Sequence, residues 1–232
     1  MSSRNPVLRG AAAAVMVAFA APGAAAADCG AVPAPLVDWR DCSKVNLMLS
    51  GSALDGADLA DADLSYTDLR NSSLAGAHFE KAAMIRSSLA GSTAAGAVFD
   101  RIEGYRTDFT GVVAPKASFA SAELQRADFS RADLTGANFA KAELGRAVFD
   151  GAVITGARFP YANLARAHLA AARFEGPLDL QNAFMLLTRM EGLDLSKAKG
   201  LAQWQLDQAC GDSGTKLPAG LKPSANWPCD AE

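Results

Sequence analysis

Large apolar residues recur at every fifth position through the middle of the chain. Residues 52–176 hold 125 positions, or twenty-five repeats, in forms such as Ala57-Asp58-Leu59-Ala60-Asp61. A small residue, usually alanine, stands two positions before each large one, which we call the centre of its repeat. A period of five matches neither the 3.6 residues of a helical turn nor the 2.0 of an ordinary strand. The pattern predicts a coil in which these two positions point inward and the other three face water.

A second period of twenty residues is laid over the first. Positions that stack in adjacent coils share an environment and should share a residue type, and every twentieth centre is indeed phenylalanine: Phe79, Phe99, Phe119, Phe139 and Phe159. Glycine follows the same count at Gly56, Gly76, Gly96, Gly136, Gly156 and Gly176. Four repeats therefore make one coil, which predicts a four-sided solenoid. A triangular solenoid of hexads would need a period of six, which is absent.

The A(D/N)LxX form of these repeats resembles that of the pentapeptide-repeat family. The resemblance implies an all-β fold, a right-handed quadrilateral parallel β-helix, over residues 49–199. With coils stacked about 4.8 Å apart, twenty-five repeats would form about six coils and a rod about 30 Å long. Its stability would come from many similar contacts between neighbouring coils.

Two stretches depart from the repeat. Between residues 92 and 116 some centres are small, and Ile102 before Gly104 moves the bulk to the other inward position. Ala94 has no such compensation, so we expect a pinch or bulge near Ala94 to Pro115. A second irregularity is a register slip near residue 177, after which one more coil should follow.

The first 27 residues have the form of a secretory signal. Arg4 and Arg9 precede an apolar run over 11–21, and Ala25-Ala26-Ala27 supplies an A-x-A cleavage site. The run is too short and too rich in alanine to span a membrane. The mature protein is therefore expected to be periplasmic or secreted in a bacterium, with no transmembrane segment after cleavage. Lipidation at Cys29 is an alternative, which Asp28 disfavours.

Four cysteines flank the repeats and suggest two disulfides in an exported chain. Bridged cysteines need Cα atoms within about 7 Å. Cys29 and Cys42 belong to one end of the expected rod, a cap over residues 28–48, and Cys210 and Cys229 to the other. We therefore predict the pairs Cys29–Cys42 and Cys210–Cys229.

The C-terminal segment, residues 200–232, should close the opposite end. Its apolar spacing over residues 201–210 suggests a short helix, with Trp204 or Leu206 covering the last coil. A loop closed by the second disulfide would follow.

Signatures of an enzyme are missing. His78 and His168 fall on different faces about four coils apart, so they can share neither a metal ion nor a proton. No phosphate loop, G-x-S-x-G or H-E-x-x-H motif occurs. The sequence predicts no enzymatic activity, no catalytic residue, no metal site and no cofactor.

One column of charged residues is the main candidate for a binding site. Two positions after the centres of one side, every twentieth residue is arginine: Arg86, Arg106, Arg126, Arg146 and Arg166. One interpretation is a self-neutralised ladder of ion pairs with carboxylates such as Glu123 and Asp128, which is the usual state of a charged surface. The other is an edge that binds sulfate, phosphate or carboxylate groups of an extended polymer.

Charge and compartment leave two classes of function. Removing residues 1–27 leaves 20 basic and 25 acidic residues, a net charge of −5. The first hypothesis is a structural or interaction module of the bacterial envelope, whose partner is an unknown protein or an anionic envelope polymer. The alternative, implied by the family resemblance, is a DNA-mimicking topoisomerase-binding protein, which the export signal and the arginines oppose. No nucleic-acid ligand is expected, and a homodimer stays open.

Overall fold

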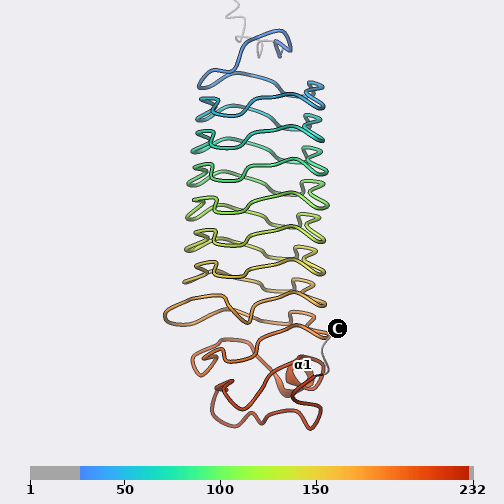
Figure 1. Cartoon of the computed structure of the whole chain (residues 1–232), viewed down its shortest axis with the longest axis vertical. Coiled ribbons are helices and arrows are strands. Elements are labelled where there is room, and N and C mark those ends of the chain that lie inside the picture. Colours follow the sequence, from blue (N-terminus) through green and yellow to red (C-terminus); the bar gives the residue numbers. More distant parts are fainter. Residues whose placement is uncertain (1–26, 230–232) are drawn as a thin grey trace, which may run out of the picture.

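A computed structural model describes residues 27–229, which wind into a four-sided tube (Figure 1). The signal expected over residues 1–27 lies outside the described residues, apart from Ala27. Successive coils pair in parallel through residues twenty positions apart, such as Asp58 with His78 and Glu103 with Glu123. The twenty-residue coil predicted from the repeats is therefore confirmed.

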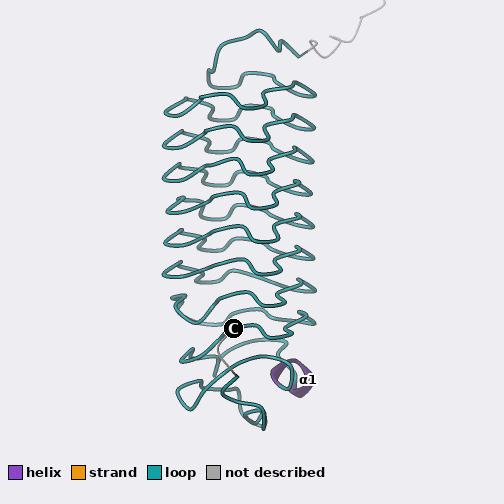
Figure 2. Ribbon diagram, turned by 45° about the vertical axis from the view of Figure 1, so that its right-hand side comes forward, coloured by secondary structure: helices purple, strands orange, loops and turns teal. Residues whose placement is uncertain are grey.

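In the regular part of the tube, each side of a coil is joined to the next coil by three backbone hydrogen bonds. Between the repeats of Phe119 and Phe139, the Phe119 N–H donates to the Asn138 carbonyl (2.8 Å), the Asn138 N–H to the Ala117 carbonyl (3.0 Å) and the Ser121 N–H to the Ala140 carbonyl (2.8 Å). The chain then turns a corner, so the paired segment on each side stays short. Within residues 27–229 the parallel pairs are single bridges, and the one helix is α1, Gln203–Leu206 (Figure 2).

The core is a dry file of stacked side chains. The rings of Phe79, Phe99, Phe119, Phe139 and Phe159 stack on one another at 4.8 to 5.0 Å, and all five are fully buried. A second stack holds Phe109, Phe129 and Phe149, and the two stacks meet edge to face at 5.6 to 6.0 Å. Both geometries are favourable for aromatic pairs.

The bulge expected near Ala94 to Pro115 does not form. The Ala94 N–H donates to Val113 and the Ala114 N–H to Asp133 without a break in the twenty-residue pairing. A Cβ added at Gly104 would lie 2.9 Å from the Leu124 side chain and 3.3 Å from that of Ile102, so these two side chains fill the space that the small centre leaves.

The buried hydroxyl groups of the same core have hydrogen-bond partners. The Ser92 hydroxyl, two residues before Ala94, donates to the Leu69 carbonyl at 2.8 Å, and the Thr107 hydroxyl donates to Met84 at 2.7 Å. Small polar residues are therefore tolerated at the inward alanine position because a carbonyl of the preceding coil accepts their proton.

The first coil begins earlier than the boundary expected at residue 48. Leu36 and Trp39 already donate backbone hydrogen bonds to the coil below, and Trp39 is a buried centre. Lys44 takes the next centre: its ammonium lies 3.8 Å from the Trp39 ring centroid and donates to the Cys29 carbonyl at 2.7 Å. Only residues 27–35 remain as a lid. The sequence concealed this coil because neither tryptophan nor lysine resembles the usual centre.

Both predicted disulfides are present, each with Cα atoms 5.4 Å apart. Among the described residues no cysteine is free. Cys29–Cys42 ties the lid to the first coil. Cys210–Cys229 closes the tail, where the Trp227 indole N–H donates to the Ala209 carbonyl at 2.6 Å.

Helix α1 is shorter than the segment expected over residues 201–210. Leu206 covers the last coil, as one alternative predicted, whereas Trp204 is 44% exposed. The fully buried Gln205 amide donates to the carbonyls of Leu180 and Ala183 at 2.9 Å. The bond to Ala183 replaces the one that a backbone N–H of another coil would have made, as the Phe184 N–H does to the Ala162 carbonyl.

The pairing lengthens to twenty-one residues where the slip was expected. Arg158 pairs with Asp179, and Asn163 with Phe184, because one additional residue enters the loop that contains Pro177. This is the wide light-orange loop in Figure 1. The coil continues below it, but one side stays open, as described further on.

Candidate functional site

Nearly every repeat turns its corner with a residue in the left-handed region, two positions after the centre; Ala171 and Lys197 are exceptions. One corner is built mostly from glycine, for example Gly56 and Gly136 with φ of 64° and 70°. The corner one half-coil away carries the candidate residues, and we call it the arginine corner. Its members, from the first coil downward, are Asn46, Tyr66, Arg86, Arg106, Arg126, Arg146, Arg166 and Leu187, with φ from 53° to 60°.

The backbone holds the arginines in one file. Each arginine N–H donates to a carbonyl of the coil below, from Arg86 to Tyr105 (3.0 Å) through Arg146 to Ala165 (2.9 Å). Their Cα atoms therefore repeat at the coil spacing of about 4.8 Å. Four of the five side chains are exposed, and Arg166 is half-buried.

The fold does not require arginine at these corners. A non-glycine residue at such a φ is strained by about 1–2 kcal/mol. We therefore expect Arg126→Gly to leave the free energy of unfolding unchanged or to raise it by up to about 1 kcal/mol, since part of the gain is offset by the freedom of glycine in the unfolded chain. Arg126→Val should lower it by about 1–2 kcal/mol because a β-branched residue fits this φ poorly. Chemical denaturation of both variants measures the difference, and a Gly variant less stable than the Val variant would contradict this account.

The self-neutralised ladder does not form at four of the five arginines of this corner. Within residues 27–229, Arg86, Arg106, Arg126 and Arg146 have no carboxylate oxygen within 4.0 Å. The Arg106 guanidinium lies 5.3 Å from the centroid of the Tyr105 ring instead. Stacked corner residues can reach each other, because Lys81 pairs with Asp61 at 3.5 Å on a neighbouring corner. At the arginine corner, the groups within reach have the same charge.

The neighbouring carboxylates have other partners. Glu143 accepts a hydrogen bond from the Asn163 amide at 2.7 Å, and Asp108 accepts one from the Ser88 hydroxyl at 2.8 Å. Asp128 accepts one from the Ser130 N–H at 2.8 Å. Columns of negative charge thus flank the arginine corner on both sides, and in the described chain their carboxylates form no ion pair with the four arginines from Arg86 to Arg146.

Apolar side chains lie at both ends of the arginine corner. At the first coils, exposed Met48 and Tyr66 border a shallow hollow of about 400 Å³ that Arg86 also lines. At the last coils, Phe184 and Leu186 are exposed on the same side. The repeat pattern does not single these residues out, because they share no residue type with the arginine column.

Within residues 27–229 there is no group of three or more metal-ligating side chains. His78 and His168 belong to different columns, as predicted, and His78 contacts Glu80 at 3.3 Å. Over the same residues, no helix has the length and apolar character needed to cross a lipid bilayer.

A family model described as pentapeptide repeats, eight copies, matches residues 52–91, 105–139, 116–151 and 147–176. Comparison with curated proteins gave no match.

Solved structures share the repeat at low overall similarity. The full-length structure of QnrB1, a plasmid-mediated fluoroquinolone resistance protein, is 21% identical with a TM-score of 0.39, covering 74% of this chain and 94% of that one. HetL, a protein involved in heterocyst differentiation regulation in Nostoc sp. strain PCC 7120, is 22% identical with a TM-score of 0.23, covering 78% and 91%. A pentapeptide repeat protein from the Arabidopsis thaliana thylakoid lumen is 27% identical with a TM-score of 0.23, covering 52% and 66%.

Proposed function

Because the chain belongs to the pentapeptide-repeat family, we propose that it is a non-enzymatic, exported binding protein of the bacterial envelope. The arginine corner holds the regularly spaced anionic groups of an extended polymer or of an acidic partner protein. Two disulfides fit an oxidising compartment, in which periplasmic and secreted proteins reside.

The single observation that carries the proposal is a file of four stacked, exposed arginines, from Arg86 to Arg146, that have no carboxylate oxygen within 4.0 Å in the described chain. Two unit charges 4.8 Å apart repel by roughly 1 kcal/mol in water, so each bound anion removes an unfavourable term as well as adding a favourable one. Guanidinium forks bind carboxylate, sulfate and phosphate groups in a bidentate manner. A rigid row of such forks suits a ligand that repeats its charge along its length.

The matched test removes equal charge from two corners. The variant Arg106→Gln/Arg126→Gln/Arg146→Gln loses three cations at the arginine corner, and the control Lys81→Gln/Arg101→Gln/Lys141→Gln loses three at the next corner. Exposed ion pairs contribute up to about 1 kcal/mol each. We therefore expect binding to heparin, measured by calorimetry, to weaken about 10- to 100-fold in the first variant and far less in the control.

Two outcomes would contradict this function. Equal weakening in both variants would assign binding to net charge rather than to the arginine corner. Binding that is unchanged in the first variant and insensitive to salt would exclude the corner altogether. Cell fractionation tests the compartment separately: oxidised chain cleaved near Ala27 belongs in the periplasm or the medium.

DNA mimicry is the less favoured alternative, although columns of carboxylates flank the arginine corner. A mimic presents rows of carboxylates to a protein that binds nucleic acid, whereas here the most regular charged row is cationic.

A further inference from the structure

One side of the tube lacks its hydrogen bonds between two successive coils. The upper segment is 172–176 and the lower segment is 193–197, and we call the space between them the open rung. In a regular coil, Phe174 would donate to Asp194, Asp194 to Ala172, and Gly176 to Ser196. None of these three bonds is present, nor does any other backbone bond join the two segments, which both lie within the described residues.

The pairing is intact immediately above and below the open rung. Arg173 pairs with Val153 in the coil above, and Asp194 pairs with Lys216 below. The additional residue near Pro177 gives a physical reason for the break, because the loop swings outward before the register is restored at Asp179. Two strand-like edges with unpaired N–H and C=O groups therefore face each other.

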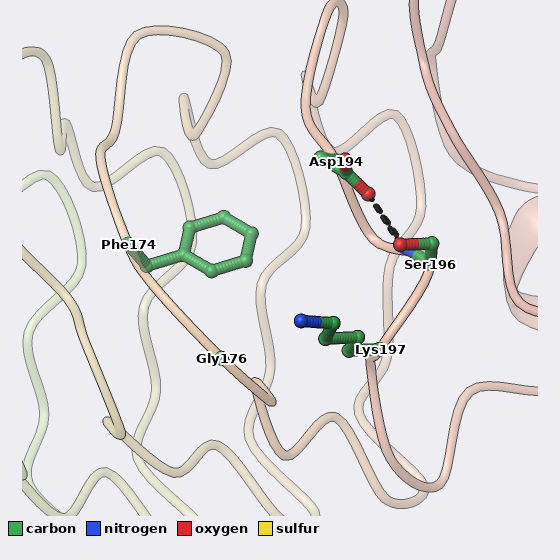
Figure 3. Close-up of a pocket in the computed structure, with 5 residues that line it drawn as sticks. All are labelled: Phe174, Gly176, Asp194, Ser196 and Lys197. Atoms are coloured by element: carbon green, nitrogen blue, oxygen red, sulfur yellow. Dashed lines mark hydrogen bonds between the residues drawn. The ribbon is translucent and has the colours of Figure 1, made fainter.

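The open rung is hollow as well as unpaired. A space of about 310 Å³ is lined by residues 170–174 and 192–194, and a second of about 140 Å³ by Phe174, Gly176, Asp194, Ser196 and Lys197. Figure 3 shows the Phe174 ring on one segment and the Lys197 side chain reaching toward it from the other. Phe174 is the centre of its repeat, yet it is only partly buried.

Of the charged side chains at the open rung, Asp194 and Arg173 have partners and Lys197 has none among the described residues. The Ser196 hydroxyl and N–H, together with the Lys216 ammonium, lower the pKa of the Asp194 carboxyl to about 2. This carboxylate is therefore ionised and already accepts hydrogen bonds from Ser196 and Lys216. The Arg173 guanidinium donates to the Gly151 carbonyl at 3.2 Å. Lys197 has no hydrogen bond or ion pair within the described chain.

We propose that the open rung is a docking site for an extended acidic peptide of a partner protein, which adds a strand between the two segments. Its backbone pairs with the free groups of Ala172, Phe174 and Asp194, in the manner of strand addition at an open sheet edge. One apolar side chain of the peptide contacts the Phe174 ring. An Asp or Glu side chain of the peptide pairs with Lys197, the one cation at the site without a partner in the described chain.

The free protein provides the first test. Amide hydrogen exchange by NMR should show the Phe174 and Asp194 N–H groups exchanging within about tenfold of the rate of an unfolded peptide, because they have no acceptor. The amides of Ile154 and Leu195 donate to Arg173 and Lys216 and should be strongly protected. Slow exchange at Phe174 and Asp194 would show a closed ladder and would overturn the proposal.

The second test uses three blocked hexapeptides as probes. A peptide of alternating valine and glutamate should slow exchange of the Phe174 and Asp194 amides at least about tenfold at saturation. The same peptide with alternate amides methylated, which removes its donors, should not do so, and a valine–lysine peptide should bind more weakly. If no probe protects these amides at millimolar concentration, or if the methylated peptide protects them equally, strand addition is wrong.

A charge reversal then locates the ligand. Lys197→Glu should lower affinity for the glutamate peptide and raise it for the lysine peptide, whereas Lys141→Glu, an equal charge change at an exposed corner, should do neither. Parallel effects of the two variants would refute the role given to Lys197. Because neither variant alters the arginine corner, the heparin measurement is independent of this result.

Discussion

Replacing Phe119 by alanine is expected to lower the free energy of unfolding by about 3–5 kcal/mol, the usual cost of emptying a packed aromatic site. The Phe119 ring stacks on Phe99 and Phe139 at 4.9 and 4.8 Å and meets Phe109 and Phe129 edge to face at 5.6 Å. Neighbouring coils are fixed by their own ladders and cannot collapse into the space. Most of the volume therefore stays empty.

The control is the same substitution at the open rung. Phe174 is partly buried and has no ring partner among the described residues, so Phe174→Ala should cost only about 1–2 kcal/mol. Denaturation with guanidinium chloride gives both values. Equal losses would mean that stability does not depend on ring stacking within the tube.

Removing the C-terminal disulfide should have the second large effect. The double variant Cys210→Ser/Cys229→Ser is expected to lose about 3 kcal/mol, because the bridge closes a loop with a sequence separation of 19. Without it, the Trp227 ring can leave Gly211, where an added Cβ would come within 2.6 Å of the ring. The last coil would then open locally before the rest.

Hydrogen exchange distinguishes this local opening from global unfolding. The Met190 amide, which donates to the Cys210 carbonyl at 2.9 Å, should lose protection in the variant. The Leu124 amide in the middle of the tube, which donates to Glu143, should keep it. Unchanged protection of Met190 and an unchanged denaturation midpoint would show that the tail stays closed without its bridge.

The regular part of the fold follows from the sequence because its columns are visible as residue types. Phe79 to Phe159 stack as predicted, and the two disulfides follow from the ends of the rod to which the cysteines belong. The side chains of Ile102 and Leu124 fill the space beside Gly104, and the expected bulge is absent. Compensation of this kind depends on side-chain packing, which a one-dimensional pattern does not record.

The ends and the sites were harder to predict. Trp39 and Lys44 act as centres only because the lid above accepts a large ring and a lysine stem, and the isolated segment gives no sign of this. The arginine file was recognised, but the lack of a carboxylate partner in the described chain at the four arginines from Arg86 to Arg146 depends on where the left-handed corner directs each side chain. The open rung depends on hydrogen bonds that a register slip breaks one coil later, at Asp194.

The hydrogen bonds between coils join residues that are only about twenty positions apart, and this determines how the chain can fold. No coil needs a distant part of the chain in order to form, so the coils can fold one after another, each on the coil before it. A polypeptide that emerges with its amino end first delivers its turns in the order of assembly. The N-terminal lid, held by its disulfide, is then the nucleus of folding, and the C-terminal tail ends the stack of coils.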